Sequence, residues 1–394
     1  MNRRLLALIC AVLALGLIAA GCGDDDDDGG GGGTSGGGGI GEGTGSAKAK
    51  AKESGEQAAK DAGGATELPP NKTVGFLQIL GGIESADRTA NAVKVALSEV
   101  GYKMVLCDGA GDPTKWATCA DSLLGRGVDA IFTTGIEPSA VAPQLKKAKA
   151  QDIPFVQVGG LVSPGYNGSY YPDEPEAGKI LSEYVLKEMD KVPEKPAQII
   201  AHDYPAPWAT SRTDELEKLV KAAPDDYEIT ATTQTDPANL VNGTRKSVTD
   251  QITSSPDTNL FWFSFDSAGQ VGGQAVAAKF PGKQFPEKPL VATFHADLGT
   301  LELMKGGAVD VALDVPYDAG PWVGVDQLLE YWGRDTPFAK EPQPSYPGIG
   351  TVYDYEVVTK DNLPPEGEYR EPANDFVTFF KTKWAAEFGG GGAN

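Results

Sequence analysis

Few residues in this chain are placed for catalysis. Histidine occurs only at His202 and His295, and neither has neighbours at the spacing of metal ligands. The chain has no H-E-x-x-H metal motif and no phosphate-loop pattern. Two carboxylates across one cleft can hydrolyse a glycoside, and the pair Asp173 and Asp266 keeps this alternative open. We therefore predict a binding protein rather than an enzyme, with no metal and no cofactor.

The candidate binding loops follow short apolar runs that are separated by segments of helical period. The runs are too short for helices and are apolar on both faces, as in a parallel sheet covered on both sides. They are Met104–Cys107, Ala130–Phe132 and Pro154–Val158. In such sheets, ligands bind beyond the carboxyl ends of the strands. The sequence therefore directs attention to the loops 108–111, 134–137 and 159–164, which include Thr134.

The same alternation extends in both directions from this region. A first strand is predicted at Val74–Leu80, and the loop after it contains Glu84. The pattern ends at a polar break, 191–195, and restarts with a strand at Ala197–Ala201. A chain of 394 residues is long enough for two domains. Two α/β domains are therefore the natural interpretation.

The composition excludes one class of partner. The net charge is −21, whereas binding to nucleic acid requires a basic face that neutralises phosphates. We expect no nucleic-acid partner. A hydrophobic fraction of 40% is enough for sizeable cores.

The amino-terminal segment is an export signal rather than part of the fold. Arg3-Arg4 precede an apolar run from Leu5 to Ile18, which is too short to span a bilayer comfortably. The segment 1–22 ends on Gly21-Cys22 and resembles a bacterial lipoprotein signal, which implies that Cys22 becomes lipid-modified. The alternative is a plain signal peptide cut near Ala20.

The segment 23–70 is predicted to be a disordered tether. It is rich in Gly, Asp, Ala and Lys and has no apolar face that would offset the entropy lost on ordering. Two cysteines then remain for the folded part of an exported protein, Cys107 and Cys119. The first ends a strand and the second lies about two turns into the next helix, so we favour a disulfide between them over two packed thiols.

From about residue 72 to 360, the chain resembles the type 1 periplasmic sugar-binding proteins, the ribose- and galactose-binding class. The motifs that carry this likeness are Asp108, Gly111-Asp112-Pro113, Gly127 to Ile131, Glu137-Pro138, Ile153-Pro154, Asp173 with Ala177-Gly178, Arg212, Phe265 to Ala268 and Asp314-Val315-Pro316. The resemblance implies two Rossmann-like lobes with parallel sheets, joined by a three-strand hinge. The crossovers are expected near 192–196, 314–318 and 348–354. These give an amino-terminal lobe of 71–192 plus 316–350 and a carboxy-terminal lobe of 193–315 plus 351–388.

The resemblance also implies which residues contact the solute. Asp173, Arg212, Asp266 and Asp314 match positions that typically do so in the family. Carboxylate oxygens and a guanidinium suit a polyhydroxylated ligand. Trp208 is a candidate for stacking against a sugar ring.

Three positions depart from the family's pattern. Glu84 lies in a loop where the family usually has aromatic rings, Phe265 stands where Asn is frequent, and His295 stands where a cleft Asp is usual. These residues are also candidate ligand contacts. They leave open a nitrogen-containing solute instead of a sugar.

The resemblance implies a monomeric, extracytoplasmic protein, anchored to the membrane by a lipid, that captures a small polar solute between its lobes. A sugar or polyol would be delivered to an ABC-type permease. The alternative is a sensor subunit that presents its closed form to a membrane receptor.

Overall fold

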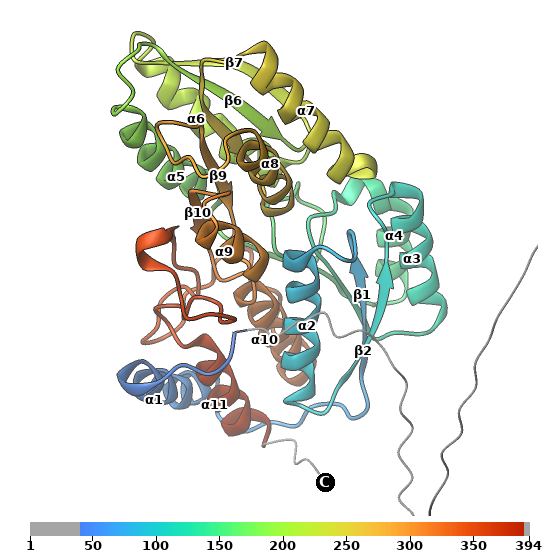
Figure 1. Cartoon of the computed structure of the whole chain (residues 1–394). Coiled ribbons are helices and arrows are strands. Elements are labelled where there is room, and N and C mark those ends of the chain that lie inside the picture. The colour runs from blue at the N-terminus through green and yellow to red at the C-terminus, as the bar shows by residue number, and fades with distance from the viewer. Residues whose placement is uncertain (1–39, 390–394) are drawn as a thin grey trace, which may run out of the picture. The chain divides into compact units, whose positions relative to one another are not determined.

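The computed structural model describes residues 40–389 (Figure 1). The predicted export signal and Cys22 lie outside these residues. Every helix among the described residues is too short or too polar to cross a bilayer. Two sheets, each covered by helices on both faces, form the two α/β lobes that the sequence predicts.

The first lobe is built on a five-stranded parallel sheet with the order β2-β1-β3-β4-β5. Its strands are β1 Thr73–Gln78, β2 Lys103–Asp108, β3 Ala130–Thr133, β4 Phe155–Val158 and β5 Gly168–Tyr170. Alternate residues of β1 face opposite sides, since Phe76 belongs to one core cluster and Leu77 to another. Helices α2 (Glu84–Ser98) and α10 (Ala319–Arg334) cover the face of Phe76. Helices α3 (Pro113–Gly125) and α4 (Ala142–Ala150), with the short helix η1 (Pro138–Val141), cover the other.

The second lobe contains a six-stranded sheet with the order β11-β10-β9-β8-β6-β7, in which only β11 is antiparallel to its neighbour. Its strands are β6 Ala197–Asp203, β7 Tyr227–Gln234, β8 Thr258–Phe263, β9 Leu290–Phe294, β10 Val311–Asp314 and β11 Glu356–Thr359. One face packs on α5 (Glu174–Met189) and α6 (Pro207–Ala222). The other packs on α7 (Leu240–Ser254), α8 (Asp266–Lys279) and α9 (Leu298–Lys305). Short helices η2 (Pro237–Asn239) and η3 (Lys360–Asn362) lie in connecting loops.

Two of the predicted lobe boundaries need correction. Helix α5 was placed in the amino-terminal lobe, 71–192, but its apolar face, including Leu181 and Val185, packs in the second lobe against α6 and the second sheet. The polar break at 191–195 ends this helix and does not mark the passage between lobes. That passage lies between β5 and α5, near 171–173.

The carboxy-terminal segment 351–388 is also divided between the lobes. Strand β11 pairs with β10 in the second lobe, as predicted. Helix α11 (Phe376–Phe388) instead inserts Phe379, Phe380 and Trp384 into the first lobe's core, where Trp384 stacks on Trp322 of α10 at a centroid distance of 5.3 Å. The aromatic side of α11 is buried there because it packs against aromatic side chains of the first lobe.

The prediction of a disordered tether over 23–70 is wrong for its second part. Residues Gly45–Asp61 form helix α1, which lies beside α11 (Figure 1). Small side chains make this possible: a Cβ atom at Gly55 would lie 2.6 Å from the carbonyl oxygen of Phe379, so only glycine permits this close approach. Burial of Ala51 and Ala58 offsets the entropy of ordering the helix. The prediction from sequence missed helix α1 because its alanine and glycine residues were not counted as an apolar face.

The predicted disulfide is present in the structure. Cys107 at the end of β2 and Cys119 in α3 are bonded, with their Cα atoms 5.6 Å apart. The bond ties the helix to the strand that it covers.

Candidate functional site

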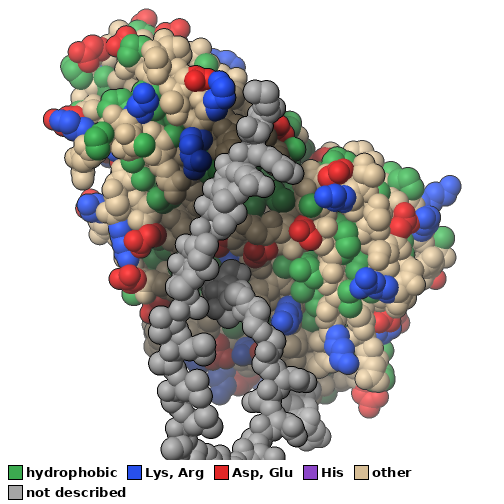
Figure 2. All heavy atoms as spheres, turned by 45° about the vertical axis from the view of Figure 1, so that its right-hand side comes forward, with side chains coloured by type: hydrophobic (Ala, Val, Ile, Leu, Met, Phe, Trp, Pro, Cys, Tyr) green, Lys and Arg blue, Asp and Glu red, His purple; other side chains and the backbone are tan. Residues whose placement is uncertain are grey.

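A cavity lies where the carboxyl ends of both sheets meet. Loops after β1, β2, β3 and β4 line it from the first lobe, and loops after β6, β7, β8 and β9 line it from the second. The empty volume is about 760 Å³, part of which is open to solvent. Five of the predicted contacts line this cavity: Thr134, Trp208, Phe265, Asp266 and His295. Figure 2 shows acidic and basic side chains interspersed on the described part of the face that it draws.

An aromatic wall from the second lobe forms one side of the cavity. Tyr204, Trp208 and Phe265 contact one another, with Tyr204 and Trp208 stacked at 5.1 Å between ring centroids and Phe265 edge-on to both. Among the described residues, no group bonds the buried Trp208 Nε1, and a Cβ atom built at Gly135 of the first lobe would lie 3.4 Å from this nitrogen. The wall can therefore offer both an apolar ring face and a hydrogen-bond donor. The sequence pointed to Trp208 but missed Tyr204, although it follows the predicted strand closely.

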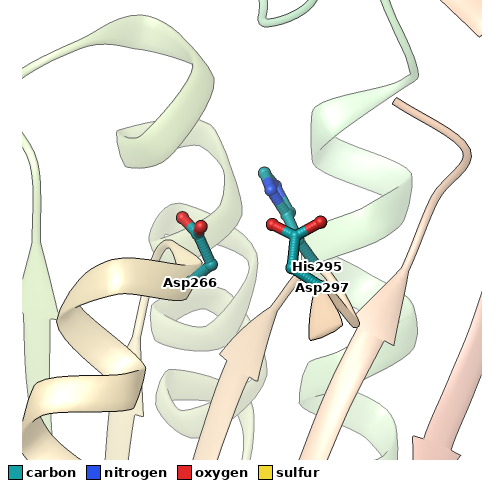
Figure 3. A group of neighbouring side chains, drawn as sticks. All are labelled: Asp266, His295 and Asp297. Carbon is teal, nitrogen blue, oxygen red and sulfur yellow. The ribbon is translucent and has the colours of Figure 1, made fainter. Parts of the chain in front are cut away.

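A cluster of polar groups lies at the carboxyl end of the second sheet. Asp266 begins α8, while His295 and Asp297 follow β9, and potential ligand atoms of the three lie within 4.8 Å of one another (Figure 3). The two carboxyl groups face each other. All three side chains are buried, and within the described residues Asp266 Oδ2, Asp297 Oδ2 and both nitrogens of His295 have no hydrogen-bond partner. Buried polar atoms of this kind await a ligand's hydrogen bonds.

The backbone conformation at His295 also indicates that this cluster is a functional site. Its φ angle is +65°, in the left-handed region that non-glycine residues rarely adopt. The ring packs on Tyr317 with centroids 3.9 Å apart. Strain at one residue, held by the surrounding packing, is typical of a position selected for where its side chain points.

Burial sets the ionisation of this cluster. It raises the pKa of Asp266 and raises that of Asp297 well above its usual value, although Arg88 opposes the shift of Asp297. Burial, together with the positive charges of Arg212 and Arg88, lowers the pKa of His295 well below its usual value. Burial therefore favours the neutral form of the imidazole and opposes two full negative charges on the facing carboxyl groups. Such groups both donate to and accept from hydroxyls.

Two acidic clusters have the donor types for a cation. In the first, Arg88 Nη1 lies 2.6 Å from Asp297 Oδ1, and this guanidinium already supplies positive charge. The second, Asp326, Glu330 and Glu387, surrounds Lys383 Nζ at 2.6 to 2.9 Å. Both clusters are thus better explained as ion-pair networks than as metal centres.

Glu84 does not line the cavity but ties the lobes together. Its carboxylate accepts hydrogen bonds from the backbone N–H groups of Leu298 (2.8 Å) and Gly299 (3.0 Å) at the start of α9, and from the Tyr369 hydroxyl (2.9 Å). A carboxylate at a helix amino terminus is favoured by the free N–H groups and the helix dipole. One turn further along α2, Arg88 pairs with Asp297. Sequence reasoning missed Arg88, whose i, i+4 spacing from Glu84 was the available signal.

Two more predicted contacts, both carboxylates, also lie outside the cavity lining. Asp173 caps α5 by accepting from the Glu176 N–H at 3.0 Å. Asp314 bonds Arg370 Nε at 2.7 Å. Their carboxylates thus serve caps and ion pairs, the ordinary uses of such groups in loops and at helix ends.

Arg212 lies behind the cavity in a buried network. It bonds Glu174 (2.7 Å), the Ser264 carbonyl (2.8 Å) and the hydroxyl of Tyr317 (2.7 Å), a residue that does line the cavity. Arg212 therefore holds Tyr317, and through it the wall near His295. Its predicted direct contact with the solute stays a prediction.

The sequence matches a known family over more than half of its length. The model described as "Periplasmic binding protein domain" matches residues 74–332. The chain belongs to this family. The family consists of binding proteins rather than enzymes, and it places the chain outside the cytoplasm.

Individual relatives are similar over shorter stretches. The xylitol-binding protein of Mycolicibacterium smegmatis is 35% identical over 17% of this chain and 20% of its own length. The galactofuranose-binding protein YtfQ of Escherichia coli is 28% identical over 31% of this chain and 39% of its own length. The matched stretches thus span well under half of either relative.

The fold likeness is more extensive. The crystal structure of a galactofuranose binding protein superposes with a TM-score of 0.62 at 20% identity, over 74% of this chain and 95% of that one. This confirms the predicted type 1 periplasmic binding protein fold with two lobes. The uncovered quarter of this chain must contain segments that the neighbour lacks.

Proposed function

We propose that this protein captures a small sugar or polyol between its two lobes and delivers it to an ABC-type permease. The cavity carries this proposal, because its lining combines an aromatic wall with buried, unpartnered polar atoms of Asp266 and His295. Aromatic rings pack on the C–H faces of sugars, while such polar atoms bond hydroxyls. The relatives named for xylitol and galactofuranose support the same class of ligand.

The test is a thermal-shift and calorimetric screen of the purified full chain against xylitol, ribose, galactose, glutamine and spermidine. A bound ligand at one hundred times its dissociation constant stabilises the fold by about 2.7 kcal/mol, which moves the midpoint measurably. We expect shifts from a sugar or polyol only. Shifts confined to glutamine or spermidine would show that the solute carries nitrogen and that the sugar proposal is wrong.

A substitution tests the site itself. Asp266→Asn keeps the shape but removes the carboxyl group that faces the cavity, and we expect the dissociation constant to rise more than tenfold, about 1.4 kcal/mol. The matched control is Asp225→Asn, in an exposed loop after α6. Equal affinities for the two variants would remove Asp266 from the site.

We also propose that a lipid on Cys22 anchors the protein to the membrane. The export signal that ends on Gly21-Cys22 supports this. A Cys22→Ala variant should be recovered in the soluble fraction and should no longer incorporate labelled palmitate. Membrane-bound Cys22→Ala protein would refute the anchor.

A further inference from the structure

The lining of the cavity is divided into two ends of different chemistry. One end is polar and combines Ser85, Asp266, His295 and Tyr317. These groups lie close together. The His295 ring contacts the Tyr317 ring, and a hydrogen bond from the Ser85 side chain acts to lower the pKa of Asp266, against the larger effect of burial. This end provides acceptors and donors for a few adjacent hydroxyls.

The other end is apolar and is formed by both lobes. From the first lobe come Leu80 and the Gly111 loop, and from the second come Pro237 and Leu240. A Cβ atom built at Gly111 would lie 3.8 Å from Leu80 Cδ1 and 3.9 Å from Pro237 Cβ, so these side chains converge on one point from opposite lobes. No side chain in this group carries a polar atom.

Further apolar side chains extend this end toward the middle of the cavity. Ile79 and Ile83 flank Leu80 in the loop after β1, and all three line the cavity. Among the described lining residues that follow β1, the first polar side chain is that of Ser85. Leu80 and Leu240 are half-buried, so an apolar ligand group packed on them would remove apolar surface from water, whereas a hydroxyl at the same place would find no side-chain partner.

Resting on the proposed function, we propose that the ligand is an amphipathic sugar derivative. Its hydroxyls bind at the Asp266–His295 end, and a deoxy methyl, alkyl or alkylthio group fills the end formed by Leu80, Pro237 and Leu240. A fully hydroxylated sugar satisfies only half of this cavity. The specificity of the site is therefore set by the apolar end, which differs from a cavity lined by polar groups all round.

Calorimetry with matched pairs tests the proposal. The probes are ribose, 5-deoxyribose and 5-methylthioribose in one series and galactose and fucose, its 6-deoxy form, in another. Each buried methylene group increases affinity about fourfold. We expect 5-methylthioribose to bind at least tenfold more tightly than ribose, or fucose at least fourfold more tightly than galactose.

Two outcomes are separable. If ribose and galactose both bind as tightly as their substituted partners, the amphipathic ligand is refuted while the proposed function stands. If none of the five sugars binds and nitrogen compounds do, the proposed function fails and this inference falls with it.

A pair of neighbouring substitutions locates the effect. Leu240→Asn places a polar group at the apolar end and should reduce the affinity ratio of substituted to unsubstituted sugar by at least fourfold. Val241→Asn is the control, because this side chain is 48% exposed at the adjacent position of α7 and does not line the cavity. The same ratio in Leu240→Asn and wild type would overturn the assignment of the apolar end.

Discussion

Replacing Glu84 by Gln should loosen the contact between the lobes without unfolding either lobe. The carboxylate accepts two backbone N–H groups of α9 and one tyrosine hydroxyl, so it connects α2 of the first lobe with the second lobe. The Gln amide retains one oxygen, and its NH₂ group faces donors with which it cannot bond. At least one hydrogen bond to a charged group is therefore lost.

The size of the effect follows from that loss. A hydrogen bond to a charged group contributes about 1.5–3 kcal/mol, which corresponds to a shift of roughly ten- to 150-fold between closed and open lobes. Because the solute binds between the lobes, its apparent dissociation constant should rise with the fraction of open protein. The thermal midpoint of the ligand-free protein should change little, since the contact lies at the surface between two separate cores.

Small-angle scattering and calorimetry measure both consequences. Ligand-free Glu84→Gln should show a larger radius of gyration than wild type, and ligand should restore the compact value. The control is Glu183→Gln, an exposed position on α5. If Glu84→Gln has the wild-type radius and affinity, the contact does not govern closure and the reasoning is refuted.

Two further predictions concern stability. Burial lowers the pKa of His202 to about 4, against the opposing bond from Gln251, so the neutral ring is favoured in the folded state. As the pH falls, the unfolded state takes up a proton on His202 before the folded state does, so the free energy of unfolding should fall by up to about 3 kcal/mol between pH 6.5 and pH 4. The variant His202→Gln should flatten this part of the curve of thermal midpoint against pH. An unchanged slope in the variant would contradict the role of His202. Lys383→Met leaves three buried carboxylates without their cation and should cost about 3–5 kcal/mol in denaturant unfolding, whereas Lys381→Met, at a side chain 33% exposed, should cost under about 1 kcal/mol. Similar losses for the two lysines would argue against the buried network.

The fold was predictable because its strands are short and regularly separated and the central ones are buried on both faces, while the edge strands β2 and β7 are partly exposed. The position of the cavity was predictable because it lies at the carboxyl ends of the strands. Thr134, Asp266 and His295 each follow a predicted strand, and the sequence therefore indicated them as lining residues. What the sequence does not reveal is which partner each charged group takes. Glu84 begins α2 and Asp314 ends β10, as expected of residues near strand ends, yet long-range pairing with α9 and Arg370 occupies them.

The lobe assignment of single helices was harder for a similar reason. The apolar stripe of α5 could pack on either sheet, and nothing in its own sequence distinguishes the second sheet, on which it packs, from the first. Helix α1 was hard to predict for a different reason. Its alanines and glycines are typical of a linker, and they form a buried face only where they pack closely against α11.

If Cys22 carries the proposed lipid, the docking of the amino-terminal segment sets an upper limit on the distance between the binding lobes and the membrane. The Ile40 N–H bonds Asp318 Oδ2 at 2.7 Å, so the chain is already attached to the body of the protein there, ahead of α1. Between Cys22 and Ile40 the sequence has 17 residues, which even fully extended span at most about 60 Å, compared with about 170 Å for the stretch from Cys22 to residue 70. Under the proposed lipid anchor, this shorter span would hold the binding lobes nearer to the bilayer and raise their local concentration at a permease there.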